Sequence, residues 1–182
     1  YMKDVLILGR GNYCKCILNN YQNKANFYTI DNILQKNKYD LVVVTYPINI
    51  LPKKLKILDT FNWESLVHLN TNGRALEFYM PYVEKYPDRN FVFNLFGLWH
   101  TREGKITRKY FRIPTLLIGN CNVVQLINNL FNVYLVLSDN IHLFIVNYHN
   151  TILHSVLISY HINRKYFYNY NTEQSIYFSK KL

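Results

Sequence analysis

The sequence feature that most constrains the fold is a pair of glycines between an apolar run and a helix-like segment. Residues 6–8 (Leu-Ile-Leu) lead directly into Gly9-Arg10-Gly11, and twenty residues past Gly11 a second apolar run, residues 25–30, ends at Asp31. This layout is typical of a dinucleotide-binding site. The glycines let the backbone approach a pyrophosphate at a helix N-terminus, and the acid accepts a hydrogen bond from a ribose hydroxyl.

The motif departs from the full Gly-x-Gly-x-x-Gly pattern at one position. The third glycine is replaced by Cys14, a residue small enough to let the helix pack closely on the strand. Two interpretations stay open: a nucleotide site, or a strand-turn-helix in which the glycines only form the turn. Under the first interpretation, the candidate cofactor-binding residues are Gly9, Gly11, Asn12, Asp31, Thr45 and Asn72.

Apolar runs alternate with amphipathic segments through the first two thirds of the chain. Strands are expected at residues 5–8, 27–30, 41–44, 65–69 and 91–96, with helices at 14–23, 53–61 and 75–86 between them. The run Leu41-Val42-Val43-Val44 is apolar at every position, which is typical of a parallel strand buried on both faces. The pattern predicts an α/β fold with a Rossmann-like doubly wound parallel sheet. Ligands of such sheets bind beyond the carboxyl ends of the strands, where the candidate cofactor residues would gather.

The pattern changes after the fifth expected strand. A turn is expected at residues 100–105, two antiparallel strands at 106–111 and 115–118, a helix at 122–132 and a strand at 133–137. From residue 141 onward, helical spacing and β-hairpins fit equally well. We expect a Rossmann-like domain at residues 1–120 and a basic C-terminal β-hairpin and helix extension at 121–182, packed on that domain.

With these elements in order, the chain resembles the cofactor-binding half of the ketopantoate reductase family. The resemblance covers roughly residues 3–157 and lies in Gly9-x-Gly11 and in residues 39–45, 69–73, 101–106 and 115–119. It implies an NAD(P)-binding domain in which Asn72-Gly73 lies beside the nicotinamide.

The resemblance also implies catalytic residues that this chain supplies in part. The family has a lysine that acts as acid and base, and an asparagine one turn later that binds substrate. Asn150 matches the asparagine, but the lysine position falls on Val146, which cannot move a proton. Lys105 and Lys109 lie in the expected hairpin and are not well placed to donate the proton. His100, at the end of the fifth expected strand, is the alternative candidate for the acid. No residue is therefore assigned as catalytic, and we expect a domain that no longer catalyses and no longer retains NAD(P).

The net charge of +10 is unevenly spread along the chain. Residues 1–103 carry 13 Lys and Arg against nine Asp and Glu, whereas residues 104–182 carry eight against two. A positive field favours polyanions such as RNA or an anionic membrane surface, although a solvated basic surface explains the charge equally well. The candidate RNA-binding residues, which have aromatic neighbours able to stack on bases, are Arg102, Lys105, Arg108, Lys109, Arg112, Arg164 and Lys165.

Composition bears on the source of the chain. It holds 24 Asn, 17 Tyr and 11 Phe but two alanines, which is typical of an AT-rich genome such as that of an organelle, a reduced parasite or symbiont, or a virus. Residues 39–81 also resemble the second protein of the small ribosomal subunit, through residues 39–47, 66–72 and Met80-Pro81. Together these features favour an intracellular location, with the mitochondrion or another organelle as a candidate.

Two classes of function follow from these features. The main prediction is a pseudoenzyme: a non-catalytic, Rossmann-like basic subunit of a larger ribonucleoprotein assembly, similar to a ribosomal protein, with RNA or protein subunits as partners. The alternative is an NAD(P)-dependent reductase of the ketopantoate reductase type.

Metal sites and membrane spans are not expected. The cysteines Cys14, Cys16 and Cys121 form no Cys-x-x-Cys pair, and the six histidines include no His-Glu-x-x-His motif. The long apolar stretch at residues 133–162 is interrupted by polar side chains, so it cannot supply the unbroken apolar span that a bilayer requires.

Overall fold

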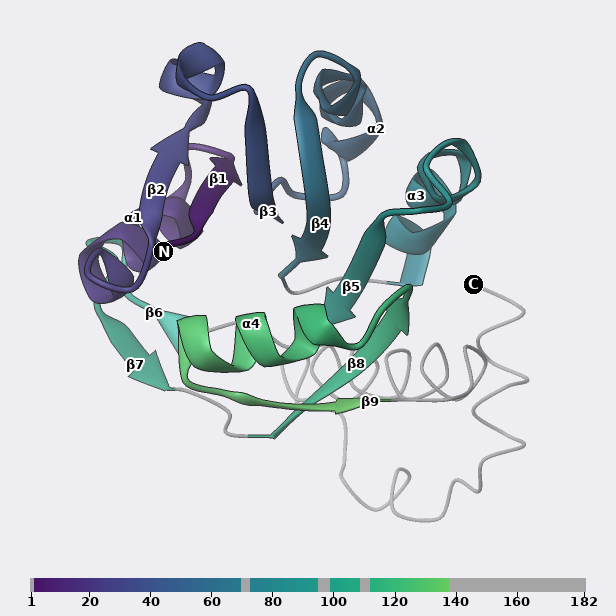
Figure 1. Ribbon diagram of the computed structural model, residues 1–182. Coiled ribbons are helices and arrows are strands. Elements are labelled where there is room, and N and C mark those ends of the chain that lie inside the picture. The colour runs from purple at the N-terminus through teal and green to yellow at the C-terminus, as the bar shows by residue number, and fades with distance from the viewer. Residues whose placement is uncertain (1, 70–72, 95–98, 109–111, 138–182) are drawn as a thin grey trace. The chain divides into compact units, whose positions relative to one another are not determined.

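The computed structural model describes residues 2–69, 73–94, 99–108 and 112–137 (Figure 1). Contacts divide the chain into two units, residues 1–137 and 138–182, and the described residues all belong to the first. The boundary expected at residue 120 falls inside this unit. The part of the predicted extension beyond residue 137 lies outside the described residues, so its packing on the domain stays a prediction.

The described elements alternate between strands and helices along most of the unit. In chain order they are β1 (Asp4–Leu8), α1 (Asn12–Tyr21), β2 (Asn26–Thr29), the 3₁₀ helix η1 (Ile30–Gln35), β3 (Lys38–Val44), α2 (Leu51–Lys54), the 3₁₀ helix η2 (Leu55–Asp59), β4 (Asn62–His68), α3 (Gly73–Lys85), β5 (Asn90–Asn94), β6 (Trp99–His100), β7 (Ile106–Arg108), β8 (Arg112–Ile118), α4 (Asn122–Phe131) and β9 (Tyr134–Leu137).

The main sheet has seven strands in the order β2-β1-β3-β4-β5-β8-β9. The first five of these pair in parallel, which confirms the five predicted parallel strands. β8 pairs antiparallel with β5, and β9 pairs parallel with β8. β1 has β2 on one side and β3 on the other, so the strand order reverses between β1 and β3. Such a reversal is the place where open α/β sheets bind ligands.

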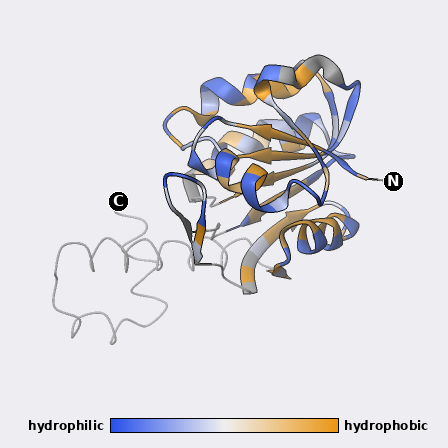
Figure 2. Cartoon of the chain, turned by 90° about the vertical axis from the view of Figure 1, so that its left-hand side faces the viewer, coloured by the Kyte–Doolittle hydropathy of each residue, from blue (hydrophilic) through white to orange (hydrophobic). Residues whose placement is uncertain are grey.

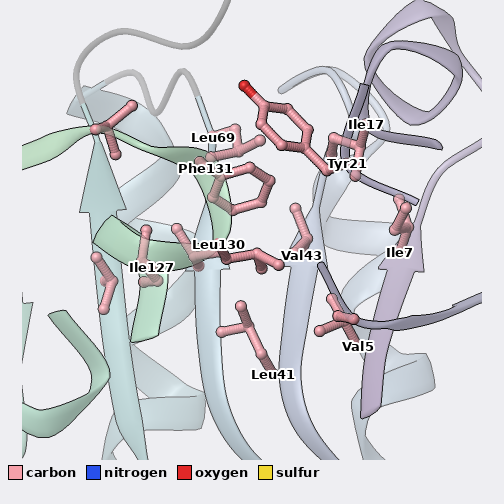
Figure 3. Packing of buried hydrophobic residues seen from close by; sticks show 14 of the residues in the cluster. Val5, Ile7, Ile17, Tyr21, Leu41, Val43, Leu69, Ile127, Leu130 and Phe131 are labelled. Atoms are coloured by element: carbon pink, nitrogen blue, oxygen red, sulfur yellow. The ribbon is translucent and has the colours of Figure 1, made fainter. Parts of the chain in front are cut away.

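Helices cover both faces of this sheet, as the apolar strands require. The side chains of residues Val5–Leu8 and Leu41–Val44 are all 0% exposed. On one face, α1 and α4 share a core with Val5, Ile7, Leu41 and Val43, and Figure 3 shows how Ile17 and Leu130 close over these residues. Figure 2 shows the mostly apolar strands between helices that carry both polar and apolar residues. The prediction of a strand buried on both faces is confirmed.

On the other face, α3 packs against β4 and β5 through aromatic rings. The ring of Tyr79 lies 5.4 Å from that of His68 and 5.1 Å from that of Phe93, measured between centroids. Tyr79 and Phe93 are both 0% exposed, so this second core is as dry as the first. Burial of aromatic rings at these distances is a main source of stability in such a layer.

Only the first part of the helix predicted at residues 53–61 is an α-helix. A short α2 is continued by the 3₁₀ helix η2, which ends where the Thr60 amide and hydroxyl both donate to the Ile57 carbonyl at 3.0 and 2.8 Å. These bonds close a tight turn, so the backbone does not propagate the wider α-helical ladder.

The predicted antiparallel pairing of residues 106–111 with 115–118 is wrong. β7 instead pairs antiparallel with β6, in a separate two-stranded sheet, whereas β8 joins the main sheet. The reason is burial, because Ile113, Thr115 and Leu116 of β8 are each 6% exposed or less. A two-stranded hairpin alone could not remove these side chains from water.

The turn of the β6–β7 hairpin docks directly on α1. Asn19 Nδ2 donates to the Glu103 carbonyl at 3.0 Å, and Asn20 Nδ2 donates to the Gly104 carbonyl at 2.9 Å. Gly104 has a φ of +83°, and a Cβ added to it would lie 2.9 Å from the Lys15 carbonyl carbon and from the Cys16 nitrogen. Glycine at this position therefore lets the hairpin approach the helix backbone.

Replacing Gly104 should loosen this contact. We expect Gly104→Ala to lower the free energy of unfolding by about 1–3 kcal/mol, because the methyl group would meet backbone atoms at a positive φ. Urea unfolding followed by circular dichroism measures the loss. Gly11→Ala is the matched control, since Gly11 has no other atom within 4 Å of an added Cβ and a φ of −79°. Equal losses in the two variants would contradict the proposed close approach.

Candidate functional site

The strand register brings the ends of β1, β2 and β3 to one edge of the sheet. Ile7 pairs with Thr29, and Leu8 pairs with Val44. Each of the candidate residues Gly9, Asp31 and Thr45 follows its paired strand residue by one or two positions. The structure therefore places them together at the carboxyl edge, beside the point where the strand order reverses.

Gly9 and Thr45 form the closest approach at this edge. The Thr45 amide and hydroxyl both donate to the Leu8 carbonyl, at 2.9 and 3.1 Å, which ties the end of β3 to the end of β1. A Cβ added to Gly9 would lie 2.1 Å from Thr45 Oγ1, and the φ of Gly9 is +139°. Glycine is therefore required here by the fold itself.

Gly11 differs from Gly9 in both conformation and surroundings. It is the N-cap of α1 with a φ of −79°, a value open to any residue, and nothing lies within 4 Å of an added Cβ. As a glycine it has no side chain to cap the first-turn amides of α1. These amides, at the positive end of the helix dipole, can therefore donate hydrogen bonds to an anion. Asn12, the first residue of α1, is exposed next to this space.

Cys14, at the position of the missing third glycine, packs into the core. Its side chain is 6% exposed and belongs to the same buried cluster as Val5 and Ile7. Burial raises the pKa of the Cys14 thiol, with a smaller contribution from the charge of Asp31. The residue is a small core side chain here, so α1 still packs closely on β1.

Arg10, between the two glycines, forms an ion pair that the sequence did not reveal. Its Nη2 donates to Asp31 Oδ1, and the two side chains are 72% and 62% exposed. Asp31 therefore lies where the motif predicts it, in the first turn of η1 after β2, but its carboxylate already has a cationic partner. The sequence did contain a signal for this ion pair: a cationic residue, Arg10, within the glycine turn, and an acid, Asp31, after the next strand.

Two titratable residues at the same edge were also missed. His68 ends β4 and is 4% exposed, and burial lowers its pKa to about 4. Tyr46 follows Thr45 and is 8% exposed; burial raises its pKa, against a smaller opposing effect of Arg10. Both side chains are therefore neutral near pH 7. Both residues lie at or just after the end of an apolar strand, and an apolar run in the sequence does not predict a buried polar group at its end.

The other predicted site residues are only partly described. Arg102 and Lys105 are exposed in the turn that docks on α1, and the backbone of Arg108 and Arg112 belongs to β7 and β8. The residues outside the described part of the chain are Asn72, Lys109, Asn150, Arg164 and Lys165. RNA binding by the cations, and substrate binding by Asn150, stay predictions.

The described residues contain no group of three or more His, Cys, Asp or Glu side chains placed to hold a metal ion. None of the helices in the described part of the chain combines the length and apolar character needed to cross a membrane.

Comparison with known proteins gives structural neighbours only. No protein-family model matches the sequence, and no curated protein sequence matches it. The fold is similar to octopine dehydrogenase, in a structure with NADH and L-arginine, with a TM-score of 0.67 at 9% identity over 85% of this chain and 53% of that one. It is also similar to the dimeric ketopantoate reductase of Staphylococcus aureus, with a TM-score of 0.55 at 13% identity over 81% of this chain and 59% of that one.

A third neighbour is prephenate dehydrogenase from A. aeolicus, in complex with hydroxyphenyl propionate and NAD⁺. The TM-score is 0.58 at 12% identity, over 99% of this chain and 79% of that one. These likenesses show a Rossmann-like α/β fold. The chain spans little more than half the length of octopine dehydrogenase and about three fifths of that of ketopantoate reductase. None of the findings supports the resemblance to the ribosomal protein.

The buried His68 should make stability depend on pH. Its pKa is about 4 in the fold against 6.5 ordinarily, so the unfolded chain binds more protons between these values. Protonation of His68 therefore leaves the free energy of unfolding unchanged above pH 6.5. As the pH falls toward 4, it lowers the free energy of unfolding by about 3 kcal/mol in total. Urea unfolding at pH 7, 6, 5 and 4 should show a steeper loss for the wild type than for His68→Leu. Parallel curves for the two proteins would show that His68 does not cause the dependence.

Proposed function

We propose that residues 1–137 are an NAD(P)-binding domain that serves an NAD(P)-dependent oxidoreductase of the ketopantoate reductase type. The structural neighbours support this reading over the main prediction from the sequence, a ribonucleoprotein subunit, because they include octopine dehydrogenase and ketopantoate reductase.

The observation that carries the proposal is the contrast between Gly9 and Gly11. Gly9 is needed for the approach of β1 to Thr45, so it would be a glycine with or without a ligand. Gly11 is needed neither for its φ nor for packing, since nothing lies within 4 Å of an added Cβ. A turn-only interpretation leaves Gly11 unexplained. A pyrophosphate lying against the backbone of Gly11 explains it, because a side chain would fill that space.

The residues at the edge fit such a cofactor. The first-turn amides of α1, with Gly11 and Asn12, would hold the pyrophosphate, and Asp31 with Arg10 would lie near the adenosine ribose. Thr45 holds the β1–β3 junction closed beneath the site through its bonds to Leu8. When bound, NAD(P) supplies or accepts the hydride.

The proton that accompanies hydride transfer is a separate requirement. Addition of hydride to a carbonyl leaves an alkoxide that needs a proton donor. His68 lies at the carboxyl edge of the sheet, but its side chain is only 4% exposed. Its pKa of about 4, which burial lowers, makes the imidazole neutral near pH 7. Among the described residues we therefore propose cofactor binding and assign no catalytic acid.

Binding of NADH to the full chain tests the proposal. NADH at millimolar concentration should raise the melting temperature of the wild type, because a ligand that binds only the folded state stabilises it. Gly11→Val should abolish this rise, since the β-branched side chain would occupy the space of the pyrophosphate. The same variant without ligand should stay within about 1 kcal/mol of the wild type, because the space is open.

Two results would contradict the proposal. One is a wild-type melting temperature that NADH leaves unchanged. The other is a Gly11→Val variant that NADH stabilises as much as the wild type, which would mean that Gly11 only forms the turn. Gly11→Ala serves as the control for loss of the glycine itself.

A further inference from the structure

A groove of about 730 Å³ lies where the C-terminal ends of α1 and α4 meet the first residue of β7. This volume is within the range of pockets that hold small organic ligands, about 300–1,000 Å³. Neither Gly9 nor Gly11 lines the groove, so it is separate from the candidate cofactor site. Tyr21 and Ile106 supply the less polar part of its wall. The other lining residues are Asn20, Lys24, Asn128, Asn129 and Asn132.

The lining of this groove differs from that of most ligand pockets. Such pockets are lined mainly by apolar and aromatic side chains, with a small number of polar groups. Here four carboxamides and one ammonium group stand beside one aromatic and one aliphatic side chain, and no carboxylate belongs to the described lining. An apolar ligand would leave these polar groups without hydrogen-bond partners, which costs free energy. The groove therefore suits a polar ligand.

Two of the four carboxamides are held in place by the fold. Asn20 Nδ2 donates to the carbonyls of Cys16 and Gly104, at 2.7 and 2.9 Å. Asn128 Oδ1 accepts from the Leu135 amide at 2.9 Å. These bonds leave Oδ1 of Asn20 and Nδ2 of Asn128 for a ligand. Because both side chains are fixed before a ligand arrives, little entropy is lost when they bind it.

The wall beneath these amides is also fixed. The ring of Tyr21 packs edge-on against that of Phe131, with 5.2 Å between centroids, and Figure 3 shows the two rings side by side. Asn132 is the C-cap of α4 with a φ of 48°, a left-handed conformation that asparagine adopts more readily than most residues. The groove is therefore part of the folded unit and does not depend on a bound ligand for its shape.

Lys24 and Asn129 provide the groups that the fold leaves unused. Both residues are exposed, and within the described part of the chain neither side chain forms a hydrogen bond or an ion pair. Lys24 has three N–H donors, and the carboxamide of Asn129 has two donors beside one acceptor oxygen. No packing or hydrogen-bonding role in the described structure explains these two residues, whereas a polar ligand in the groove would contact both.

The charge of the groove favours an anion. Helix C-termini alone would disfavour one, because they are the negative ends of the helix dipoles. Here the last carbonyls already accept hydrogen bonds from the chain: that of Tyr21 from the Lys24 amide at 2.8 Å, and that of Asn128 from the Val133 amide at 3.1 Å. The groups that remain for a ligand are an ammonium group and carboxamides, so N–H donors are in excess.

From these observations we propose that the groove binds a small polyhydroxylated anion of the sugar-phosphate class. The phosphate pairs with Lys24 and accepts from the amide of Asn128. Hydroxyl groups both donate and accept hydrogen bonds, as carboxamides do, so the sugar hydroxyls bond to Asn129 and Asn132. The C–H face of the sugar lies on Tyr21 and Ile106. This site is additional to the proposed cofactor site and does not depend on it.

Titration calorimetry of the full chain with glucose 6-phosphate, glucose and inorganic phosphate tests the proposal. We expect the wild type to bind glucose 6-phosphate at least about 10-fold more tightly than either of the other probes, because only the whole ligand contacts both Lys24 and the carboxamides. Lys24→Gln should weaken the binding of glucose 6-phosphate about 10-fold, and Asn129→Ala about 3- to 10-fold, the ranges for hydrogen bonds to charged and to neutral groups.

Lys56→Gln is the matched control for the loss of a lysine charge, because Lys56 is exposed in η2 and does not line the groove. It should bind glucose 6-phosphate like the wild type. Gly11→Val should do the same, because Gly11 belongs to the candidate cofactor site. All of the lysine and asparagine changes are at exposed side chains, so thermal unfolding followed by circular dichroism should show melting temperatures close to that of the wild type.

Several results would overturn the proposal. Inorganic phosphate that binds as tightly as glucose 6-phosphate would indicate an adventitious ion only. A wild type that binds none of the three probes at millimolar concentration excludes the site. Wild-type affinity in both Lys24→Gln and Asn129→Ala, or loss of binding in Gly11→Val, would place the ligand elsewhere. An equal loss in Lys56→Gln would reduce the effect to net charge. None of these results concerns NADH, so each of them leaves the proposed function standing.

Discussion

The junction of β1 with β3 is the interaction on which the rest of this structure depends. The carbonyl of Leu8 accepts hydrogen bonds from both the amide and the hydroxyl of Thr45, so the two strands end at the same level. The chain reaches β2 through α1 on one side of this junction and continues to β4 on the other. The reversal of strand order sets where a ligand can enter, and the close approach at Gly9 sets the path of the glycine turn.

The three residues of the short turn after β1 have different surroundings. Gly9 serves the fold, because both its φ and its contact with Thr45 exclude a side chain. Gly11 leaves an open space at the start of α1, and Arg10 between the two glycines forms an ion pair with Asp31. A single turn thus combines one residue required by packing, one that leaves the start of the helix open and one that pairs with the acid after the neighbouring strand.

The basic character of the protein and its fold carry different information. A net charge of +10 favours polyanionic partners, but it says nothing about architecture. The fold places the uncapped N-terminus of α1 at one edge of the sheet, and the neighbours that share this fold include structures with NADH or NAD⁺. The turn that carries Arg102 and Lys105 is held against α1 by hydrogen bonds from Asn19 and Asn20. The observed contacts of this hairpin are therefore with α1.

The sequence by itself determined the five parallel strands and the placing of Gly9, Gly11, Asp31 and Thr45 at one edge. These follow from local rules: an unbroken apolar run such as Leu41–Val44 needs cover on both faces, and parallel strands end at a common edge. Only the tertiary structure decided that β8 pairs with β5 and not with β7, that Arg10 neutralises Asp31, and that His68 is buried against Tyr79. Each of these depends on which distant segment arrives beside it. Pairing between distant residues is decided by burial and charge in three dimensions, and periodicity along the chain does not record it.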